Sequence, residues 1–397
     1  MKQFLRSIVV TVLTFEAKLV LRKHAPRIIA ITGSVGKTTT RDAIHAALSG
    51  SVHVRKSQKS FNTDLGVPLT ILGVDNAGWS VLGWLEHMLR GLFVIFGKTY
   101  PEVLVLEVGA DHPGDIKKMH WLAPSVVVLT RFPDVPAHVE FFSSPEEVRE
   151  EKRELRRALR EDGVLCVNAD DPHLQREPVS DTQRKVSFGY AKEATVRLVD
   201  YESAYEHERL VGGRVHVVYD KTQDTVLLRG VLGAHYAYSV SAAIAVACEA
   251  FGVPLATACA RLSDRAGAEY APGRMRVFAG KGDSTIIDDT YNASPASVAG
   301  LLDTLRDVRA GGKKIVVLGD MMELGEHTAR EHRKVGEHAA DVADVFVAVG
   351  VRMKEALQAA QQTGACRTEW CADSTQAGVL LEEIVGQGDV VAYKAAG

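Results

Sequence analysis

The sequence indicates an α/β protein with a central, mostly parallel sheet that carries an antiparallel β addition, followed by a smaller α/β domain. Two observations support this assignment. Short β-branched apolar runs alternate with helical patterns through the first half of the chain, as expected for parallel strands joined by crossover helices. The same alternation starts afresh after residue 272, which places a domain boundary near that position.

Four runs in the first half are predicted to be buried strands, because they lack the strict alternation of apolar and polar residues that a half-exposed strand shows. They are residues 27–32, 102–108, 125–130 and 163–168. Three further runs, separated by polar turns, are predicted to be antiparallel strands attached to the sheet. They are residues 196–201, 213–220 and 224–230. A long Ala-rich helix follows and ends at Gly252, with Pro254 just beyond it.

The second half of the chain predicts a Rossmann-like domain. Its strand candidates are residues 284–289, 313–320, 344–350 and 389–394. Its helices are expected at residues 295–309, 327–341, 352–361 and 374–385. We therefore expect three parts: an N-terminal amphipathic helix in residues 1–26, a central domain in residues 27–272 and a C-terminal domain in residues 273–397.

Composition argues against several classes of function. With 397 residues, 46% hydrophobic and 24% charged, the chain has the make-up of an ordinary globular protein of two or three domains. Its formal net charge of −3 provides no excess of Lys and Arg, so no nucleic-acid partner is expected. Five scattered cysteines without a CxxC pair favour a reducing cytoplasm and argue against a metal-thiolate site. Oligomeric state stays open.

Two apolar segments bear on membrane contact. Residues 8–15 are apolar, but charged residues follow too soon for a bilayer span of about 20 apolar residues. We expect residues 1–26 to form a helix packed on the first domain, with peripheral contact to a membrane surface as the alternative. Residues 79–96 are apolar but interrupted by charged residues, so we expect a largely buried helix there, with contact to a membrane as the alternative.

The segment ITGSVGKTTT, from Ile31 to Thr40, has the composition of a phosphate-binding loop. It follows a predicted buried strand and precedes a helix expected to begin about Thr39, which is the setting of a P-loop NTPase-like sheet. Glycines let backbone N–H groups approach phosphate oxygens, and the helix N-terminus adds a favourable dipole. Lys37 can neutralise the β- and γ-phosphates, and the Thr38 hydroxyl can complete a Mg²⁺ shell. The loop is a shorter GxxGKTT variant of the common pattern, because Ile31 stands where that pattern has its first glycine.

Two further residues attract attention by their positions. Glu107 ends a predicted strand, at the carboxyl edge where α/β sheets bind ligands, and could share a Mg²⁺ ion with the phosphate loop. Lys152 lies in the helical segment PEEVREEKREL, where the simplest interpretation is an exposed lysine paired with an acid one turn earlier. However, the residues one turn earlier are Val148 and Arg149, and neither pairs with a lysine.

Six later motifs accompany the phosphate loop. They are FNTDLGVPLTIL, LEVGADHPGDI, AHVEFFSSPEEVREEKREL, PGRM, DDTYNASP and LGDMMELGEHTAREH. Together with the loop they resemble the Mur ligase family, ATP-dependent enzymes that form amide bonds in cell-wall precursors. The resemblance covers roughly residues 27–394 and is greatest to the branch that adds D-alanyl-D-alanine to a UDP-muramoyl tripeptide.

The resemblance implies a set of site residues. ATP would be bound by Gly33, Ser34, Val35, Gly36, Lys37, Thr38, Thr39, Ser239, Arg274, Asp289 and Asn292. Two Mg²⁺ ions would be held by Thr38, Glu107, His138 and Lys152, after CO₂ has carbamylated the lysine and made it a carboxylate-like ligand. Catalytic roles are implied for Lys37, His138, Lys152 and Arg274. His332 is a candidate substrate-binding residue near the incoming amine, with an ordinary helix-surface histidine as the alternative.

The implied reaction is ligation of a small-molecule peptide precursor to an amine. The acid would attack the γ-phosphate of ATP, and the amine would then displace phosphate from the acyl phosphate. Two alternatives stay open: a ligase for another acid, such as a polyglutamate or an archaeal wall peptide, and a nucleotide-binding partner subunit without ligase activity of its own.

Three departures from the family pattern bear on the substrate. Only about 26 residues precede the first strand, so the usual N-terminal UDP-binding domain is expected to be lacking. Arg131, Tyr236 and Ser239 stand at positions where the family favours other residues, which predicts altered contacts to adenine. The chain ends in VVAYKAAG, which leaves open whether the C-terminal domain is clipped.

Overall fold

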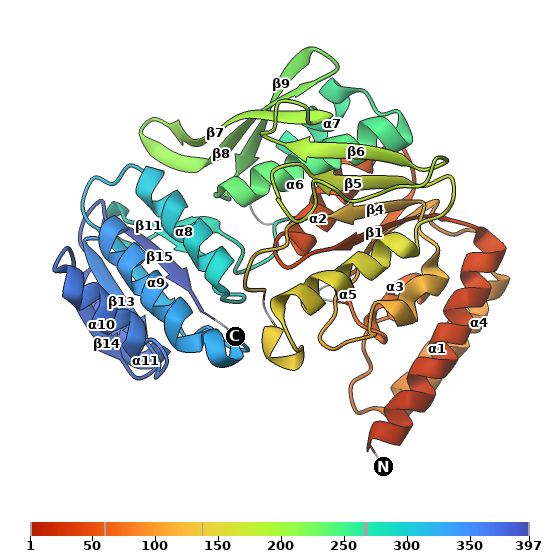
Figure 1. The fold of residues 1–397 in the computed structure, drawn as a ribbon, viewed down its shortest axis with the longest axis horizontal. Helices are drawn as coiled ribbons and strands as arrows, with labels where there is room; N and C mark the ends of the chain where they lie inside the picture. The colour runs from red at the N-terminus through yellow and green to blue at the C-terminus, as the bar shows by residue number, and fades with distance from the viewer. Residues whose placement is uncertain (1, 59–60, 137, 266–268, 396–397) are drawn as a thin grey trace.

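The computed structural model describes residues 2–58, 61–136, 138–265 and 269–395, and Figure 1 shows their arrangement. Two sheets organise them, one of nine strands and one of six. Together they confirm the predicted fold class.

The nine-stranded sheet has the order β2-β3-β1-β4-β5-β6-β7-β8-β9. Strands β2 to β7 pair in parallel, whereas β7, β8 and β9 pair antiparallel, so the predicted β addition extends the parallel sheet at one edge. The strands are β1 (Arg27–Thr32), β2 (Val54–Lys56), β3 (Val103–Glu107), β4 (Val126–Leu129), β5 (Val164–Asn168), β6 (Arg184–Gly189), β7 (Val196–Glu206), β8 (Arg209–Tyr219) and β9 (Thr222–Arg229).

Helices cover both faces of the parallel strands, which explains why those strands are apolar throughout. Ile29 and Ile31 of β1 belong to the core cluster that contains α2 and α6, whereas Ile28 and Ala30 belong to a second cluster with α1, α3 and α5 on the other face. The helices of this part are α1 (Lys2–His24), α2 (Lys37–Leu48), α3 (Gly66–Leu72), α4 (Val81–Phe96), α5 (Pro145–Arg157), α6 (Ala234–Ala245) and α7 (Leu255–Ser263).

The six-stranded sheet has the order β10-β11-β15-β12-β13-β14, and all its neighbours pair in parallel except β10 with β11. Its strands are β10 (Arg276–Ala279), β11 (Thr285–Asp288), β12 (Lys314–Gly319), β13 (Val345–Val349), β14 (Arg367–Cys371) and β15 (Val390–Lys394). Its helices are α8 (Pro295–Asp307), α9 (Thr328–Val342), α10 (Lys354–Thr363) and α11 (Ser374–Ile384). Short 3-10 or π segments are η1 (Lys117–Leu122), η2 (Val139–Phe141), η3 (Val246–Ala250), η5 (Lys281–Asp283) and η6 (Gly325–His327).

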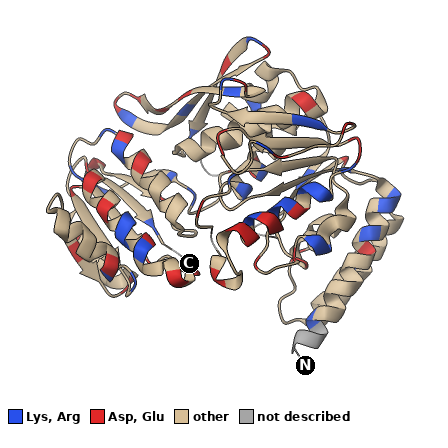
Figure 2. Ribbon diagram, in the orientation of Figure 1, with Lys and Arg blue, Asp and Glu red and all other residues tan. Residues whose placement is uncertain are grey.

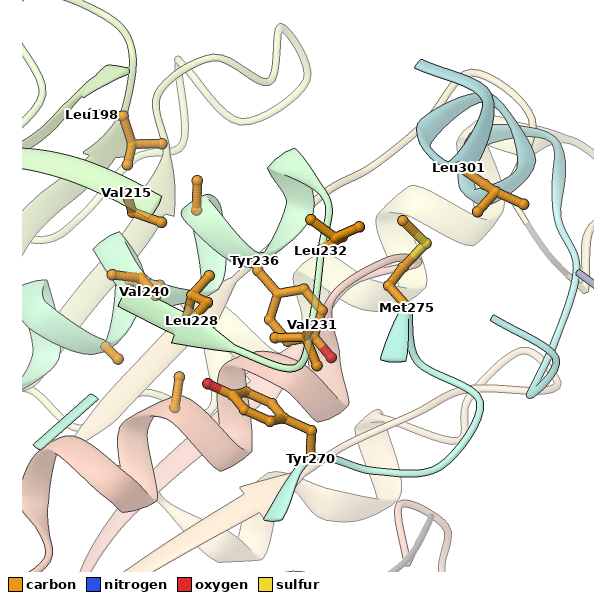
Figure 3. Packing of buried hydrophobic residues seen from close by; sticks show 14 of the residues in the cluster. Leu198, Val215, Leu228, Val231, Leu232, Tyr236, Val240, Tyr270, Met275 and Leu301 are labelled. Atoms are coloured by element: carbon orange, nitrogen blue, oxygen red, sulfur yellow. The ribbon is translucent and has the colours of Figure 1, made fainter. Parts of the chain in front are cut away.

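A continuous hydrophobic core joins the two sheets. Figure 3 shows Leu232 and Tyr236, from the part of the chain that forms the larger sheet, close to Met275, with Leu301 of α8 farther along the same cluster. The backbone reinforces this junction, because the Leu232 N–H donates to the Met275 carbonyl at 3.0 Å. The two sheets are therefore held in a defined relation at this junction around Met275, which we call the hinge.

The structure corrects one expectation about α4. We predicted a largely buried helix in residues 79–96, but Gly91 is the one fully buried residue among the described residues of α4. The helix packs on α1 and α3 at the outer edge of the molecule, and its far side is exposed (Figure 1). α1 itself packs through buried Leu13, Ala17 and Val20. Across the described part of the chain, no helix combines the length and apolar character needed to cross a bilayer.

Candidate active site

The phosphate loop joins β1 to α2 at the carboxyl edge of the larger sheet. Gly33 has φ 147°, and a Cβ there would lie 2.0 Å from Thr130 Oγ1, so a side chain cannot be accommodated. Gly36 has φ 87° and directly precedes the first turn of α2. The Lys37 ammonium donates to the Gly33 carbonyl at 2.8 Å, and Thr130 Oγ1 donates to the Val35 carbonyl at 2.7 Å. The loop is thus held in shape, and with the N-terminus of α2 it lines a cavity, an arrangement suited to binding an anion.

Thr38 and Glu107 lie side by side, although 69 positions separate them in the sequence. Thr38 Oγ1 donates to Glu107 Oε2 at 2.9 Å, and the Asn62 amide donates to Glu107 Oε1 at 3.3 Å. The Arg41 guanidinium lies 3.5 Å from the same carboxylate. A hydroxyl and a carboxylate beside a phosphate loop are oxygen ligands of the kind that Mg²⁺ takes together with nucleotide phosphates and water. These residues therefore fit a nucleotide-bound Mg²⁺ ion.

Lys152 is buried on α5, which excludes the interpretation of an exposed surface lysine. No ion-pair partner for it occurs among the described residues. Burial, and secondarily the charge of Lys37, lowers the pKa of Lys152 to about 7. The neighbouring Glu151 accepts backbone hydrogen bonds from Gly114 at 2.8 Å and Ile116 at 2.7 Å, which fixes this turn of α5 against the segment after β3.

His138 lies where the two halves of the molecule meet. It adopts φ 65°, in the left-handed region, and leads into η2. Its Nδ1 lies 2.5 Å from Glu323 Oε2, which comes from the segment between β12 and η6, and its Nε2 lies 3.9 Å from Asp111 Oδ1. The imidazole is thus held by a carboxylate from the second domain on one side and faces the segment after β3 on the other.

The second domain contributes residues from the start and the end of its sheet. The Arg274 guanidinium lies over the Tyr291 ring, 4.0 Å from its centroid, and Arg274 Nε is buried without a hydrogen-bond partner in the described part of the chain. Asp289 is buried, accepts from the Met275 N–H at 3.2 Å and pairs with the Lys394 ammonium. Both groups are therefore fixed close to the hinge.

Ser239 lies on α6 and contacts the phosphate-loop helix directly. Its Oγ lies 2.9 Å from Thr39 Oγ1, accepts from Thr40 Oγ1 at 3.1 Å and donates to the His235 carbonyl at 3.2 Å. Tyr236, the other altered position in this helix, donates through its hydroxyl to the Arg274 carbonyl at 2.8 Å. The two substitutions thus connect α6 to the loop and to the hinge.

A single cavity of about 680 Å³ brings most of the predicted site together. Its lining includes Ser34, Val35, Gly36, Lys37, Thr38, Thr39, Glu107, His138, Lys152, Ser239, Arg274, Asp289 and Asn292. Gly33 shapes the loop from behind, against Thr130. His332 lies outside this cavity: it is fully buried, its Nδ1 lies 2.7 Å from the Thr328 carbonyl, and its Nε2 accepts from the Met321 N–H at 3.2 Å.

Sequence reasoning did not select several residues that line this cavity or hold its parts. Asn62 and Asp111 belong to motifs that the sequence displays, FNTDLG and LEVGADH, so the signal was present. Lys394 stands in the C-terminal strand and had no local signal, because its partner Asp289 is 105 positions away. Within the described ranges, no three His, Cys, Asp or Glu side chains converge on one point as metal ligands.

Two models of known protein families match the chain. The model of the Mur ligase middle domain matches residues 31–247, and the model described as Mur ligase, glutamate ligase domain matches residues 273–397. The chain belongs to the Mur ligase family. The resemblance inferred from the motifs is thereby confirmed.

Among curated Mur ligases, a Bacillus subtilis UDP-N-acetylmuramoyl-tripeptide–D-alanyl-D-alanine ligase is 31% identical over 327 residues, which cover 82% of this chain. The Mycobacterium leprae ligase of the same name is 30% identical over 393 residues and 93% of this chain. The chain spans 63% of the length of the first relative and 70% of the second.

A solved structure of a Mur ligase has a similar fold. The crystal structure of the MurF ligase from Thermotoga maritima in complex with ADP is similar over 98% of this chain and 80% of that one. The TM-score is 0.77 and the sequence identity 26%.

Proposed function

We propose that this protein is an ATP-dependent, ADP-forming ligase that joins D-Ala-D-Ala, or a similar amine, to a cell-wall peptide precursor. The observation that carries the proposal is the shared cavity, in which the phosphate loop, Glu107 and Lys152 of one domain face Arg274 of the other. The relatives' names and the ADP of the Thermotoga maritima structure support the choice of substrates and nucleotide.

The first step brings two anions together. A carboxylate oxygen of the acid attacks the γ-phosphorus of ATP, the bond to ADP breaks, and an acyl phosphate forms. Lys37 and the phosphate-loop N–H groups would bind the phosphates, and Arg274 would approach them from the second domain. Such positive groups are needed because two anions repel strongly in a poorly hydrated cleft.

The second step forms the amide. The neutral amine nitrogen attacks the carbonyl carbon of the acyl phosphate, the tetrahedral intermediate expels phosphate, and the nitrogen loses a proton to phosphate or solvent. Cationic groups already placed around the phosphate stabilise the charge of this intermediate without reorganising. The same Lys37 and Arg274 side chains can therefore serve both steps.

We propose that Thr38 and Glu107 hold one Mg²⁺ ion with the nucleotide, and that His138 and carbamylated Lys152 hold a second. Bound Mg²⁺ would neutralise developing negative charge on the phosphoryl oxygens. The pKa of about 7 supports the modification, because only the neutral amine of Lys152 reacts with CO₂, giving a carbamate and releasing one proton. His138 would exchange its Glu323 partner for this role.

We place the protein in the cytoplasm, where ATP is available. Its five cysteines are all free, and four of them are buried. We also propose the predicted organisation into residues 1–26, 27–272 and 273–397 as its functional units.

The test is a product-mass measurement with ATP, Mg²⁺, a UDP-muramoyl tripeptide and D-Ala-D-Ala. We expect a product whose mass equals acid plus amine minus water, and ADP release that requires both substrates. Lys37→Ala should abolish both signals. If amide forms only when a different acid replaces the UDP-muramoyl tripeptide, the substrate assignment is refuted. If ADP release never depends on an added amine, the result supports a nucleotide-binding subunit instead.

A further inference from the structure

The outward side of α4 is an apolar surface at the far end of the molecule from the second domain (Figure 1). Leu82, Leu85, Leu89 and Phe93 recur at helical spacing, and Leu82 and Phe93 are 79% and 78% exposed. Phe96 continues the row, and Trp79 precedes the helix with 85% exposure. We call these six residues the α4 face.

The opposite side of α4 is also apolar, but it is covered. Gly91 is buried against α1, and Trp84, Met88, Val94 and Ile95 pack partly buried against the core cluster of this domain. α4 is therefore apolar on two sides, of which one is covered by the protein and the other is exposed. Contiguous exposed apolar surface of this kind marks a site of interaction with a protein or a membrane.

The charge around the α4 face favours a membrane over a protein as its partner. The sequence of α1, which lies beside α4, has five Lys or Arg residues and one Glu, although the whole chain has a formal net charge of −3. Arg22 and Lys23 are exposed, and the Lys23 ammonium donates to the carbonyls of Ile95 and Gly97 at the C-terminal end of α4. Figure 2 shows basic residues of α1 on this outer edge.

The composition of the face also suits a lipid interface. Trp79 lies at one end, and Trp favours the level of the head groups. Phe93 and Phe96 lie at the other end, and Phe is common on the apolar side of interfacial helices. Arg90 is exposed and pairs with Glu86 at the rim. Apolar residues on one side with basic residues nearby are typical of helices that lie in the plane of an anionic membrane surface. At 16 residues α4 is about 24 Å long, which permits it to lie along such a surface.

We propose that the α4 face docks this protein on a membrane surface that carries anionic lipids, with α4 lying in the head-group region. The sequence had left membrane contact open as an alternative for residues 1–26 and for residues 79–96. In the structure α1 instead packs inward through Leu13 and Ala17 and contributes the basic charge. The active-site cavity lies between the two domains, away from α4, so docking leaves it open to a water-soluble nucleotide.

Vesicle flotation with the full chain tests the proposal. We expect binding to vesicles of phosphatidylcholine with phosphatidylglycerol, weaker binding to phosphatidylcholine alone, and loss of binding in high salt. The variant Leu89→Glu/Phe93→Glu should bind at least about tenfold more weakly. The matched control Val379→Glu, at an exposed apolar position of α11, should bind like the wild type.

Nucleotide binding by the Leu89→Glu/Phe93→Glu variant should stay unchanged, which shows that the variant folds, because α4 contributes nothing to the cavity. The fluorescence of Trp79, isolated as the difference between wild type and Trp79→Phe, should shift to the blue on vesicles. The proposal is overturned if the wild type does not bind anionic vesicles. It is equally overturned if the two glutamates leave vesicle binding intact, or if they only dissociate a dimer formed in solution.

Discussion

At the scale of single residues, the environment of Lys152 decides what its amine can do. Removal from water lowers its pKa to about 7, so the amine is increasingly neutral as the pH rises through that value. We therefore expect the carbamate to form above about pH 7 and to be lost as the pH falls below it. Carbon NMR of the protein in ¹³C-bicarbonate should show a carbamate signal with this pH dependence.

Two replacements of Lys152 distinguish the effect of its positive charge from the effect of its carbamylation. Lys152→Arg keeps the charge and Lys152→Ala removes it, and neither can form the carbamate, so both should reduce ligase activity by about 100-fold or more. Short carboxylic acids should partly restore activity to Lys152→Ala alone. Lys118→Ala, at an exposed position of η1, is the matched control. Full activity in Lys152→Ala would refute the role of the carbamate.

Glu16 offers a residue-scale prediction about stability. Its carboxylate is buried against Gly91, Oε2 has no hydrogen-bond partner in the described residues, and burial raises its pKa to about 7. An acid whose folded-state pKa is raised binds more protons when folded, so stability should fall as the pH rises from about 4.5 to 7.

Glu16→Gln removes this pH dependence. At pH 8 the variant should be more stable than the wild type, by up to about 3 kcal/mol, and the difference should vanish near pH 4.5. Urea unfolding at both pH values measures it. Glu86→Gln, at an exposed position of α4, should show no such gain. Equal stability of Glu16→Gln and wild type at pH 8 would show that folding does not raise the pKa of Glu16.

At the scale of elements, Asp289 and Lys394 connect two neighbouring strands of the second sheet. Asp289 follows β11, Lys394 ends β15, and both side chains are buried. Lys394→Met leaves the Asp289 carboxylate uncompensated and should lower the free energy of unfolding by about 3–5 kcal/mol. The double variant Asp289→Asn/Lys394→Met should recover most of this loss.

Denaturant unfolding of the three proteins gives the comparison. The control is Arg367→Met, which breaks an exposed pair with Glu369 and should cost less than about 1 kcal/mol. If the double variant is as unstable as Lys394→Met, the charges of the pair are not the cause of the loss.

The elements that the sequence predicted well are those whose burial is complete. β1, β3, β4 and β5 are buried along most of their length, and their β-branched runs could be recognised without any neighbour. Strands β2, β6, β10 and β14 were not predicted. β2, β10 and β14 are short strands at sheet edges with few buried residues, and β6 begins with two exposed basic residues. Pairing with a neighbour, which no local pattern encodes, makes them strands.

The error over α4 has a related physical cause. Its hydrophobic residues correctly predicted a helix, but an apolar pattern does not specify whether protein, lipid or another chain covers each side. Residues 79–96 therefore could not reveal that one side faces outward.

At the scale of the whole molecule, the candidate active site depends on contacts between segments far apart in the sequence. The phosphate loop could be recognised locally, because its glycines and lysine are consecutive. The proximity of Thr38 to Glu107 could be inferred from the rule that parallel strands end at the same edge of a sheet. The pairing of His138 with Glu323 required the relation between the two domains. Helical position alone could not show that His332 lies on the buried side of α9, where its ring contacts the Met321 N–H.

Transfer of labelled oxygen from the acid to phosphate reports whether an acyl phosphate forms. In the proposed reaction, one oxygen of the acid bridges to phosphorus in the acyl phosphate and leaves with the phosphate when the amine attacks. We predict that a substrate whose carboxylate carries ¹⁸O will give inorganic phosphate with one ¹⁸O atom per amide bond formed, as measured by mass spectrometry. Phosphate without ¹⁸O from a reaction that forms the amide would rule out the acyl phosphate intermediate.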